Sequence, residues 1–467
     1  MDREKTKGQA LAEQLLMKKR SCFEQLGADA EKKIEAYAAD YMAFMDCSKT
    51  EREFVKSAAA LLTKAGFAPF DPDKIYKAGD RLYWNNRGKS LMAAVVGAQG
   101  IAAGADIMAA HIDSPRLDLK PNPLYEDSEL GYFKTHYYGG IKKYQWTAIP
   151  LALHGVVAKK DGSCVDVCIG EDEGDPVFCV TDILPHLSHK VQDERTTRDV
   201  IKGEELNVLI GSVPFDDSEV AERVKLNLMR LLHEKYGIVE ADFNSAELEI
   251  VPAFKARYIG LDRSMIGAYG HDDKVCAYTA LTALLDTPAP ERTALLILAD
   301  KEETGSDGNT GMHSDMLRSF LTLLCRRAGC DYETVCGKCK CLSADVNAAL
   351  DPTFPEVHEK RNAAFLNYGP VITKYTGSAG KYGTNDASAE FIAEVRAKLD
   401  GKHVPWQTGE LGKVDEGGGG TVAKFISALG IDVVDIGVAM LSMHAPFEIV
   451  TCADVYATHM AFCAFIQ

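Results

Sequence analysis

The sequence has no long apolar run and is short of positive charge. Its longest weakly charged stretch, residues 91–110, contains Asp106 and several glycines, which predicts two strands and a turn rather than a membrane span of roughly 20 residues. Lysine and arginine number 52 against 68 aspartates and glutamates, so the formal net charge is −16. A surface this acidic repels phosphate backbones and anionic lipid headgroups. We therefore expect neither nucleic acid nor a membrane as a partner.

Proline, glycine and cysteine are too scarce for several classes of protein. The 467 residues include 17 prolines and 39 glycines, and 46% are hydrophobic, which excludes disordered and collagen-like chains and predicts two or three domains. The 13 cysteines are odd in number and lack the spacing of a secreted disulfide framework. The charged start of the chain, residues 1–5, lacks the apolar segment of a signal peptide. We therefore expect a cytoplasmic protein with reduced thiols.

Hydrophobic periodicity predicts helices at both ends of the chain. Near the N-terminus, apolar residues recur at helical spacing over residues 9–25, 31–44 and 51–64. Residues 91–96 and 105–110 are short apolar runs typical of buried strands. After Asp272, strands alternate with helices, which predicts a mostly parallel sheet with helices on both faces. The predicted strands there are 294–299, 341–344 and 433–438, and the predicted helices are 274–285, 314–327, 387–399, 420–429 and 453–466.

The middle third of the chain has a different pattern. Alternating and aromatic residues with turn dipeptides predict strands, among them a β-hairpin over residues 151–169, and a single helix over 217–236. The chain is therefore predicted to be an α/β protein with a mixed, mostly parallel sheet flanked by helices and a β-rich inserted second domain. The main domain would comprise residues 1–115 and 255–467, and the insert residues 116–254.

Metal-binding side chains follow the predicted strands of the main domain. In open α/β sheets, ligands bind beyond the carboxyl ends of the strands, so polar residues at these positions are expected to meet at one edge of the sheet. They are His111 and Asp113 after strand 105–110, Asp272 and Asp273 at the start of a helix, Glu302 and Glu303 after strand 294–299, Asp345 after strand 341–344, and His444 shortly after strand 433–438.

This grouping of two imidazoles and several carboxylates predicts a metal centre. Crowded carboxylates repel one another and are costly to remove from water unless a cation neutralises them. Zn²⁺ accepts both histidine nitrogen and carboxylate oxygen, and two such ions commonly share a bridging carboxylate and a water. Two histidines and three carboxylates suffice for two ions and leave one glutamate free to act as a base. The spare glutamate favours a catalytic role over a purely structural one.

Four short segments around these residues occur in a characteristic order. They are AHIDSP at residues 110–115, DKEETG at 300–305, SAD at 343–345 and MH at 443–444. In order and spacing they resemble the aspartyl aminopeptidase family of di-zinc metallopeptidases, and the resemblance covers nearly the whole chain. It implies a zinc-aminopeptidase-like fold, a β-rich insert used for dimer and higher subunit contacts, and assembly as a tetrahedral homo-dodecamer.

The resemblance also implies a role for each metal ligand. Asp272 would bridge two Zn²⁺ ions per subunit. His111 and Asp345 would complete one site, and Glu303 and His444 the other. Co²⁺ or Mn²⁺ could substitute for zinc.

Two further residues would act on the reaction. The resemblance implies that Glu302 is the general base. Asp113 would orient His111 through its second ring nitrogen, a role with independent physical sense because ligating histidines are commonly held in this way.

The substrate-binding residues follow from looser matches to the family. His186 lies in a segment that reaches a neighbouring active site in some relatives. The loop after residues 370–372 supplies Lys374, Lys381 and Tyr382, and either lysine could receive an acidic side chain, because a carboxylate is best held by a cation.

The predicted function is that of a metalloaminopeptidase that removes an N-terminal residue, with Asp or Glu as the family's preference, from peptides. Two alternatives remain open at this point. One is a di-metal carboxypeptidase or deacylase of the same fold, and the other is a shell-forming, peptide-binding protein whose metals only hold the structure.

Overall fold

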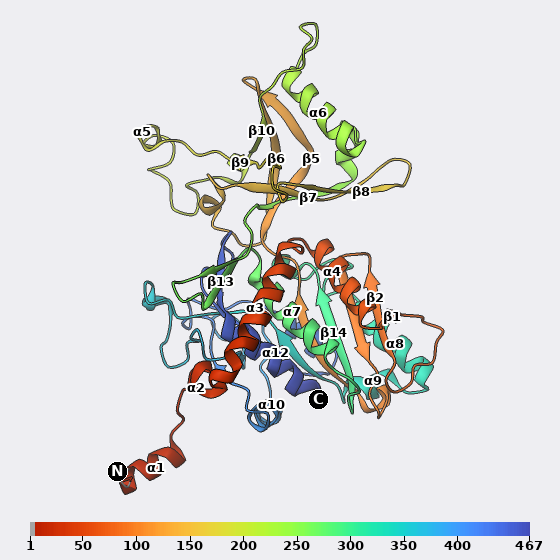
Figure 1. Ribbon diagram of the computed structural model, residues 1–467, viewed down its shortest axis with the longest axis vertical. Coiled ribbons are helices and arrows are strands. Elements are labelled where there is room, and N and C mark those ends of the chain that lie inside the picture. Colours follow the sequence, from red (N-terminus) through yellow and green to blue (C-terminus); the bar gives the residue numbers. More distant parts are fainter. Residues whose placement is uncertain (1–4) are drawn as a thin grey trace.

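Two large sheets, each with its own hydrophobic core, organise the chain (Figure 1). The structure is a computed structural model that describes residues 5–467, so the first four residues of the charged start lie outside the described part. Within residues 5–467, no helix combines the length and apolar composition needed to cross a membrane.

The larger sheet has nine strands and is mixed. Its four central strands, β14, β4, β15 and β19, are all parallel, whereas antiparallel pairs occur toward both edges. The predicted mixed, mostly parallel sheet is therefore confirmed. In spatial order the strands are β1 (Ala68–Pro69), β2 (Arg81–Asn86), β3 (Ser90–Val95), β14 (Thr293–Ala299), β4 (Ala105–His111), β15 (Lys340–Ala344), β19 (Asp432–Gly437), β17 (Val371–Thr373) and β18 (Gln407–Thr408).

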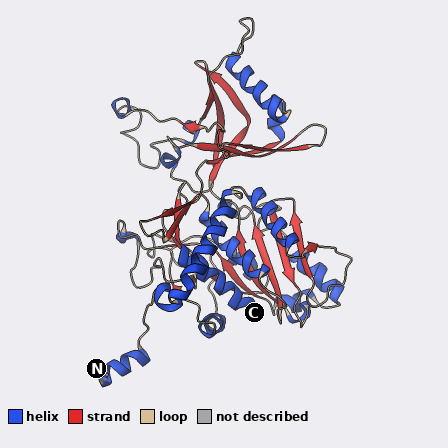
Figure 2. Cartoon of the chain, in the orientation of Figure 1, coloured by secondary structure: helices blue, strands red, loops and turns tan. Residues whose placement is uncertain are grey.

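Helices cover both faces of this sheet (Figure 2), as predicted. Successive side chains of a strand point to opposite faces, so Leu296 and Leu298 of β14 join one core while Leu295 and Ile297 join the other. One face packs against α3 (Glu31–Asp46), α4 (Glu51–Lys64), α7 (His271–Leu285), α10 (Ala389–Gly401) and α12 (Cys452–Ile466), and the other against α8 (Met316–Ala328), α9 (Tyr332–Cys336) and α11 (Ala423–Ser427).

The second sheet is formed between Arg116 and Pro252 and is antiparallel throughout. Its core includes the buried Trp146 and Phe133, and α6 (Arg223–Tyr236) packs on it. A separate core is the physical basis on which we propose a boundary near residues 115 and 255. In spatial order the strands are β8 (Cys164–Ile169), β7 (Leu151–Ala158), β11 (Ala246–Pro252), β5 (Arg116–Asp127), β6 (Leu130–Tyr138), β10 (Val208–Gly211) and β9 (Cys179–Val180).

Buried charges join the insert to α4 of the main domain. His154 on β7 lies 2.7 Å from Glu53 Oε1 and 3.0 Å from Glu171 Oε1, and Lys49 also pairs with Glu171. Burial alone would lower the pKa of His154, but its hydrogen bonds, which include those to Glu171 and Glu53, raise that pKa to about 11. The protonated imidazole therefore links a carboxylate of each domain.

Three predicted helices have different bounds in the structure. The run over residues 9–25 forms two helices, α1 (Lys7–Leu15) and α2 (Cys22–Leu26), because Ser21 and Glu24 form a capping box that starts the second one. The helix expected from residue 217 begins at Arg223, and the one expected over 420–429 is only α11. The remaining short elements are α5 (Pro185–Ser188), β12 (Arg257–Ile259), β13 (Met265–Ala268), β16 (Asn347–Ala348), β20 (Ala439–Met440) and β21 (Glu448–Thr451).

Candidate active site

The candidate metal ligands lie at the carboxyl edge of the central parallel strands. His111 is the last residue of β4, and Asp345 directly follows β15. Glu303 lies in a single 3₁₀ turn after β14, and Asp272 lies in the first turn of α7. Because parallel strands end at the same edge, segments far apart in the sequence meet there.

Asp272 lies between the two histidines. Its Oδ1 is 3.2 Å from His111 Nε2, and its Oδ2 is 3.1 Å from His444 Nε2. Asp345 Oδ1 lies 3.9 Å from His111 Nε2, and Glu303 Oε2 lies 3.6 Å from His444 Nε2. Asp272 thus contacts both histidines, and ligand atoms of His111, Asp272 and Glu303 all lie within 4.8 Å of one another, as do those of His111, Glu302 and Asp345.

The electrostatics of the cluster fit a divalent metal. Burial raises the pKa of Glu302 to about 7 and raises the pKa values of Glu303 and Asp345 well above their usual range. A cation held among these carboxylates would offset the cost of burying them. Glu303 Oε1 is buried with no hydrogen-bond partner. Imidazole nitrogens and carboxylate oxygens are ligands that Zn²⁺ accepts, so the residues present fit this ion.

Asp113 fixes the segment that carries the two glutamates. The peptide N–H groups of Glu302 and Glu303 donate to its two carboxylate oxygens, at 3.1 and 3.2 Å. Tyr138 Oη, at the end of β6 in the insert, donates to the same carboxylate at 2.7 Å. His111 Nδ1 lies 3.0 Å from the backbone oxygen of Asp113 and 3.4 Å from Oδ1. Asp113 thus positions both glutamates through its carboxylate and His111 mainly through its backbone oxygen.

Sequence reasoning missed a second positioning carboxylate, Glu448. Its two oxygens accept hydrogen bonds from the peptide N–H groups of Asp272 at 3.1 Å and His444 at 2.7 Å. Burial raises the pKa of Glu448 to about 8. His444 Nδ1 lies 2.7 Å from the backbone oxygen of Gly140 in the insert. The only sequence signal for Glu448 is its position as an acidic residue in an otherwise apolar run. The contact of His444 with the backbone oxygen of Gly140 leaves no signal in the sequence, because every residue has such an oxygen.

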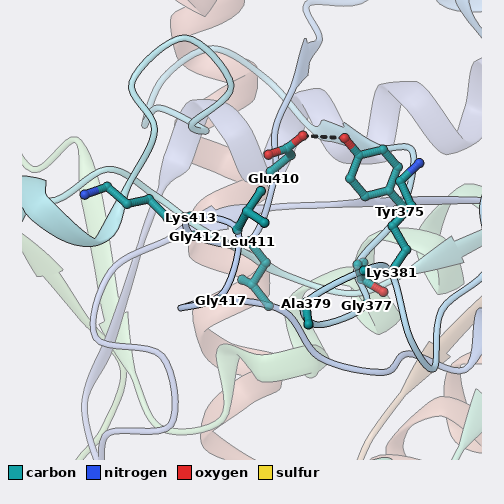
Figure 3. Close-up of a pocket in the computed structure, with 12 residues that line it drawn as sticks. Tyr375, Gly377, Ala379, Lys381, Glu410, Leu411, Gly412, Lys413 and Gly417 are labelled. Atoms are coloured by element: carbon teal, nitrogen blue, oxygen red, sulfur yellow. Dashed lines mark hydrogen bonds between the residues drawn. The ribbon is translucent and has the colours of Figure 1, made fainter.

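A cavity of about 500 Å³ is lined by four of the candidate metal ligands, Asp272, Glu303, Asp345 and His444. Its walls include Glu302, Thr373, the glycines at 418–420 and Lys424. A second cavity of about 340 Å³ adjoins it (Figure 3). The two cavities share Thr376 and Leu411.

Within a single subunit, none of the four residues predicted to bind substrate lines the metal cavity. Lys381 lines the second cavity beside Tyr375 (Figure 3). Its Nζ lies 3.8 Å from the centre of the Tyr375 ring and 3.0 Å from Asp386 Oδ2. Neither Lys374 nor Tyr382 is among the residues that line these two cavities. His186 lies on α5, on an arm of the insert away from the main domain (Figure 1). Their substrate roles stay predictions.

A family model described as aminopeptidase I zinc metalloprotease (M18) matches residues 44–466. The chain belongs to the M18 family of zinc metalloproteases. A probable M18 family aminopeptidase 1 from Clostridium acetobutylicum is 48% identical over 462 residues, which cover 97% of this chain and 99% of that protein.

Solved structures agree with this assignment. The M18 aminopeptidase of Thermotoga maritima superposes with a TM-score of 0.91 at 45% identity, over 97% of this chain and 99% of that one. The mApe1 dodecamer of S. cerevisiae has a TM-score of 0.76 at 21% identity, over 93% and 97% of the two chains, which shows a shared fold alone. The M18 fold, including its sheet-rich second part, is thus that of this chain.

Proposed function

We propose that this M18 aminopeptidase prefers peptides with an N-terminal Asp or Glu, and that it hydrolyses them at a two-metal centre. The observation that carries the proposal is the position of Asp272 between two histidines, each with its own further carboxylate. Two zinc ions held by these five residues would polarise the scissile carbonyl and activate a water.

Glu302 is the residue best placed to move the proton. It lines the cavity, and its Oε2 lies 3.9 Å from His111 Nε2. Its backbone N–H donates to the carboxylate of Asp113, which fixes the position of the Glu302 main chain. Glu302 would accept a proton from the attacking water and then pass it to the leaving amine. Asp113 and Glu448 would hold the ligand-bearing segments in place while this happens.

Assay of a residue panel tests this function. The metal-loaded protein should release N-terminal Asp and Glu from short peptides faster than Leu, Met or Ala. Peptides whose α-amine is acetylated should not be cleaved, because an aminopeptidase needs the free amine. Release of C-terminal residues or of the acyl group would instead support the carboxypeptidase or deacylase alternative. Metal content without turnover on any substrate would support the structural alternative.

We also propose that the insert mediates assembly into a large homo-oligomer, a dodecamer by the family resemblance. The insert has exposed apolar side chains, including Leu231, Val213 and Leu187, that burial between subunits would stabilise. Light scattering should therefore report a particle several times the 50.9 kDa of the chain. A monomer at micromolar concentration would contradict this.

A cytoplasmic location is consistent with the absence of a disulfide among the 13 cysteines.

A further inference from the structure

Lys424 is a positively charged residue in the wall of the metal cavity. It has no role in the proposed mechanism. It lies in α11, directly after the glycine-rich segment 417–420, and its side chain is exposed. Its Nζ lies 4.7 Å from the centre of the neighbouring Phe425 ring. Among the lining residues of this cavity there is one lysine and no arginine. The other basic side chain in the wall, His444, is a candidate metal ligand.

The amine of Lys424 is not paired with a carboxylate in the part of the chain that the structure describes. Among residues 5–467, no Asp or Glu oxygen lies within 4.0 Å of its Nζ, although the cavity is lined by five acidic residues. Four of these, Asp272, Glu302, Glu303 and Asp345, are the candidate metal ligands and base. Lys381, by contrast, already pairs with Asp386. Lys424 is therefore free to bind an anion that enters the cavity.

The segment that carries Lys424 is held in place from two sides. The N–H of Gly419 donates to the backbone oxygen of Thr376 at 2.9 Å. The hydroxyl of Thr421, at the other end, donates to Asp435 at 2.8 Å. Gly420, between these anchors, has no side chain to fill the space beside the lysine, and a Cβ there would lie 4.0 Å from Lys424 Nζ. The exposed lysine thus follows an anchored backbone segment and lies in the wall of the cavity.

We propose that Lys424 forms a carboxylate-binding subsite that receives the side chain of an N-terminal Asp or Glu. This rests on the acidic preference proposed above and assigns it to a residue of the metal cavity. A cation near a carboxylate forms a charge-assisted hydrogen bond, and a substrate side chain that neutralises Lys424 avoids repulsion by the acidic wall. A neutral side chain would gain nothing from the lysine.

Replacement of Lys424 by methionine tests the subsite, because it keeps most of the length and removes the charge. For Lys424→Met we expect kcat/KM for N-terminal Asp and Glu to fall about 10- to 100-fold, the effect of losing one hydrogen bond to a charged group. The value for Leu and Ala should change less than about threefold. Lys424→Arg should keep most of the acidic preference. Lys402→Met, an exposed lysine at the end of α10 that lines neither cavity, is the matched control and should behave like the wild type.

Three results would overturn the subsite. The first is an unchanged preference for Asp and Glu in Lys424→Met, and the second is an equal loss on acidic and neutral substrates. The third is a loss seen with free peptides but absent when the peptide C-terminus is amidated, which would mean that Lys424 binds the C-terminal carboxylate. The substrate preference of the wild type distinguishes these three results from failure of the proposed function. A wild type that prefers Leu removes the acidic preference and the subsite together, and one that cleaves no N-terminal residue removes the proposed function as well.

Discussion

Glu302→Gln should lower kcat by about 10²–10⁴ or more while the metals remain bound. Glutamine keeps the shape of the side chain and removes the proton acceptor. Glu302 lines the cavity with its side chain only 16% exposed, and its backbone is fixed by Asp113, so a water is poorly placed to replace it as the base. Steady-state kinetics and metal analysis on the same sample measure both halves of this expectation.

The neighbouring Glu303→Gln variant is the control. Glu303 Oε2 faces His444 Nε2 at 3.6 Å, so this change should lower the zinc content, and excess zinc should restore part of the activity. Excess zinc should not rescue Glu302→Gln. If Glu302→Gln turned over normally, or if the two variants exchanged these phenotypes, the roles of the two glutamates would have been assigned wrongly.

Removal of metal should abolish activity, and zinc, cobalt or manganese should restore it. The candidate ligands are three carboxylates and two histidines, and a bound cation would offset the burial that raises the pKa values of Glu303 and Asp345. The apolar cores lie between the sheet and its helices, away from this edge. We therefore expect the far-ultraviolet circular dichroism of the metal-free protein to stay close to that of the loaded form.

The thermal midpoint should nevertheless fall when metal is removed. Ions that bind the native chain and not the unfolded one stabilise it by mass action, at about 2.7 kcal/mol when the free ion is 100-fold above its Kd. Calorimetry of chelated and zinc-loaded samples measures the difference. Full activity after exhaustive chelation, verified by metal analysis, would refute the two-metal mechanism.

Local sequence determined most of the main domain. Runs such as residues 294–299 are apolar at every position, which is typical of a short strand buried on both faces, and β14 has that environment. Capping residues set where helices begin, as Thr50 and Glu53 do for α4. Because parallel strands share a carboxyl edge, the residues after each strand could be expected to meet, and the structure brings His111 and Asp345 together there.

Only the tertiary structure decided what holds these ligands. Glu448 binds the N–H of Asp272 across 176 positions of sequence, and Tyr138 reaches Asp113 from the insert. The tertiary structure also decided which lysine is placed to bind an acidic substrate side chain. Sequence reasoning favoured Lys374 and Lys381 because they share a loop near a strand end, whereas the structure puts Lys424 in the wall of the metal cavity and pairs Lys381 with Asp386. A local pattern records strand period, caps and turns, but whether a lysine is paired or free depends on side chains that long-range packing brings beside it.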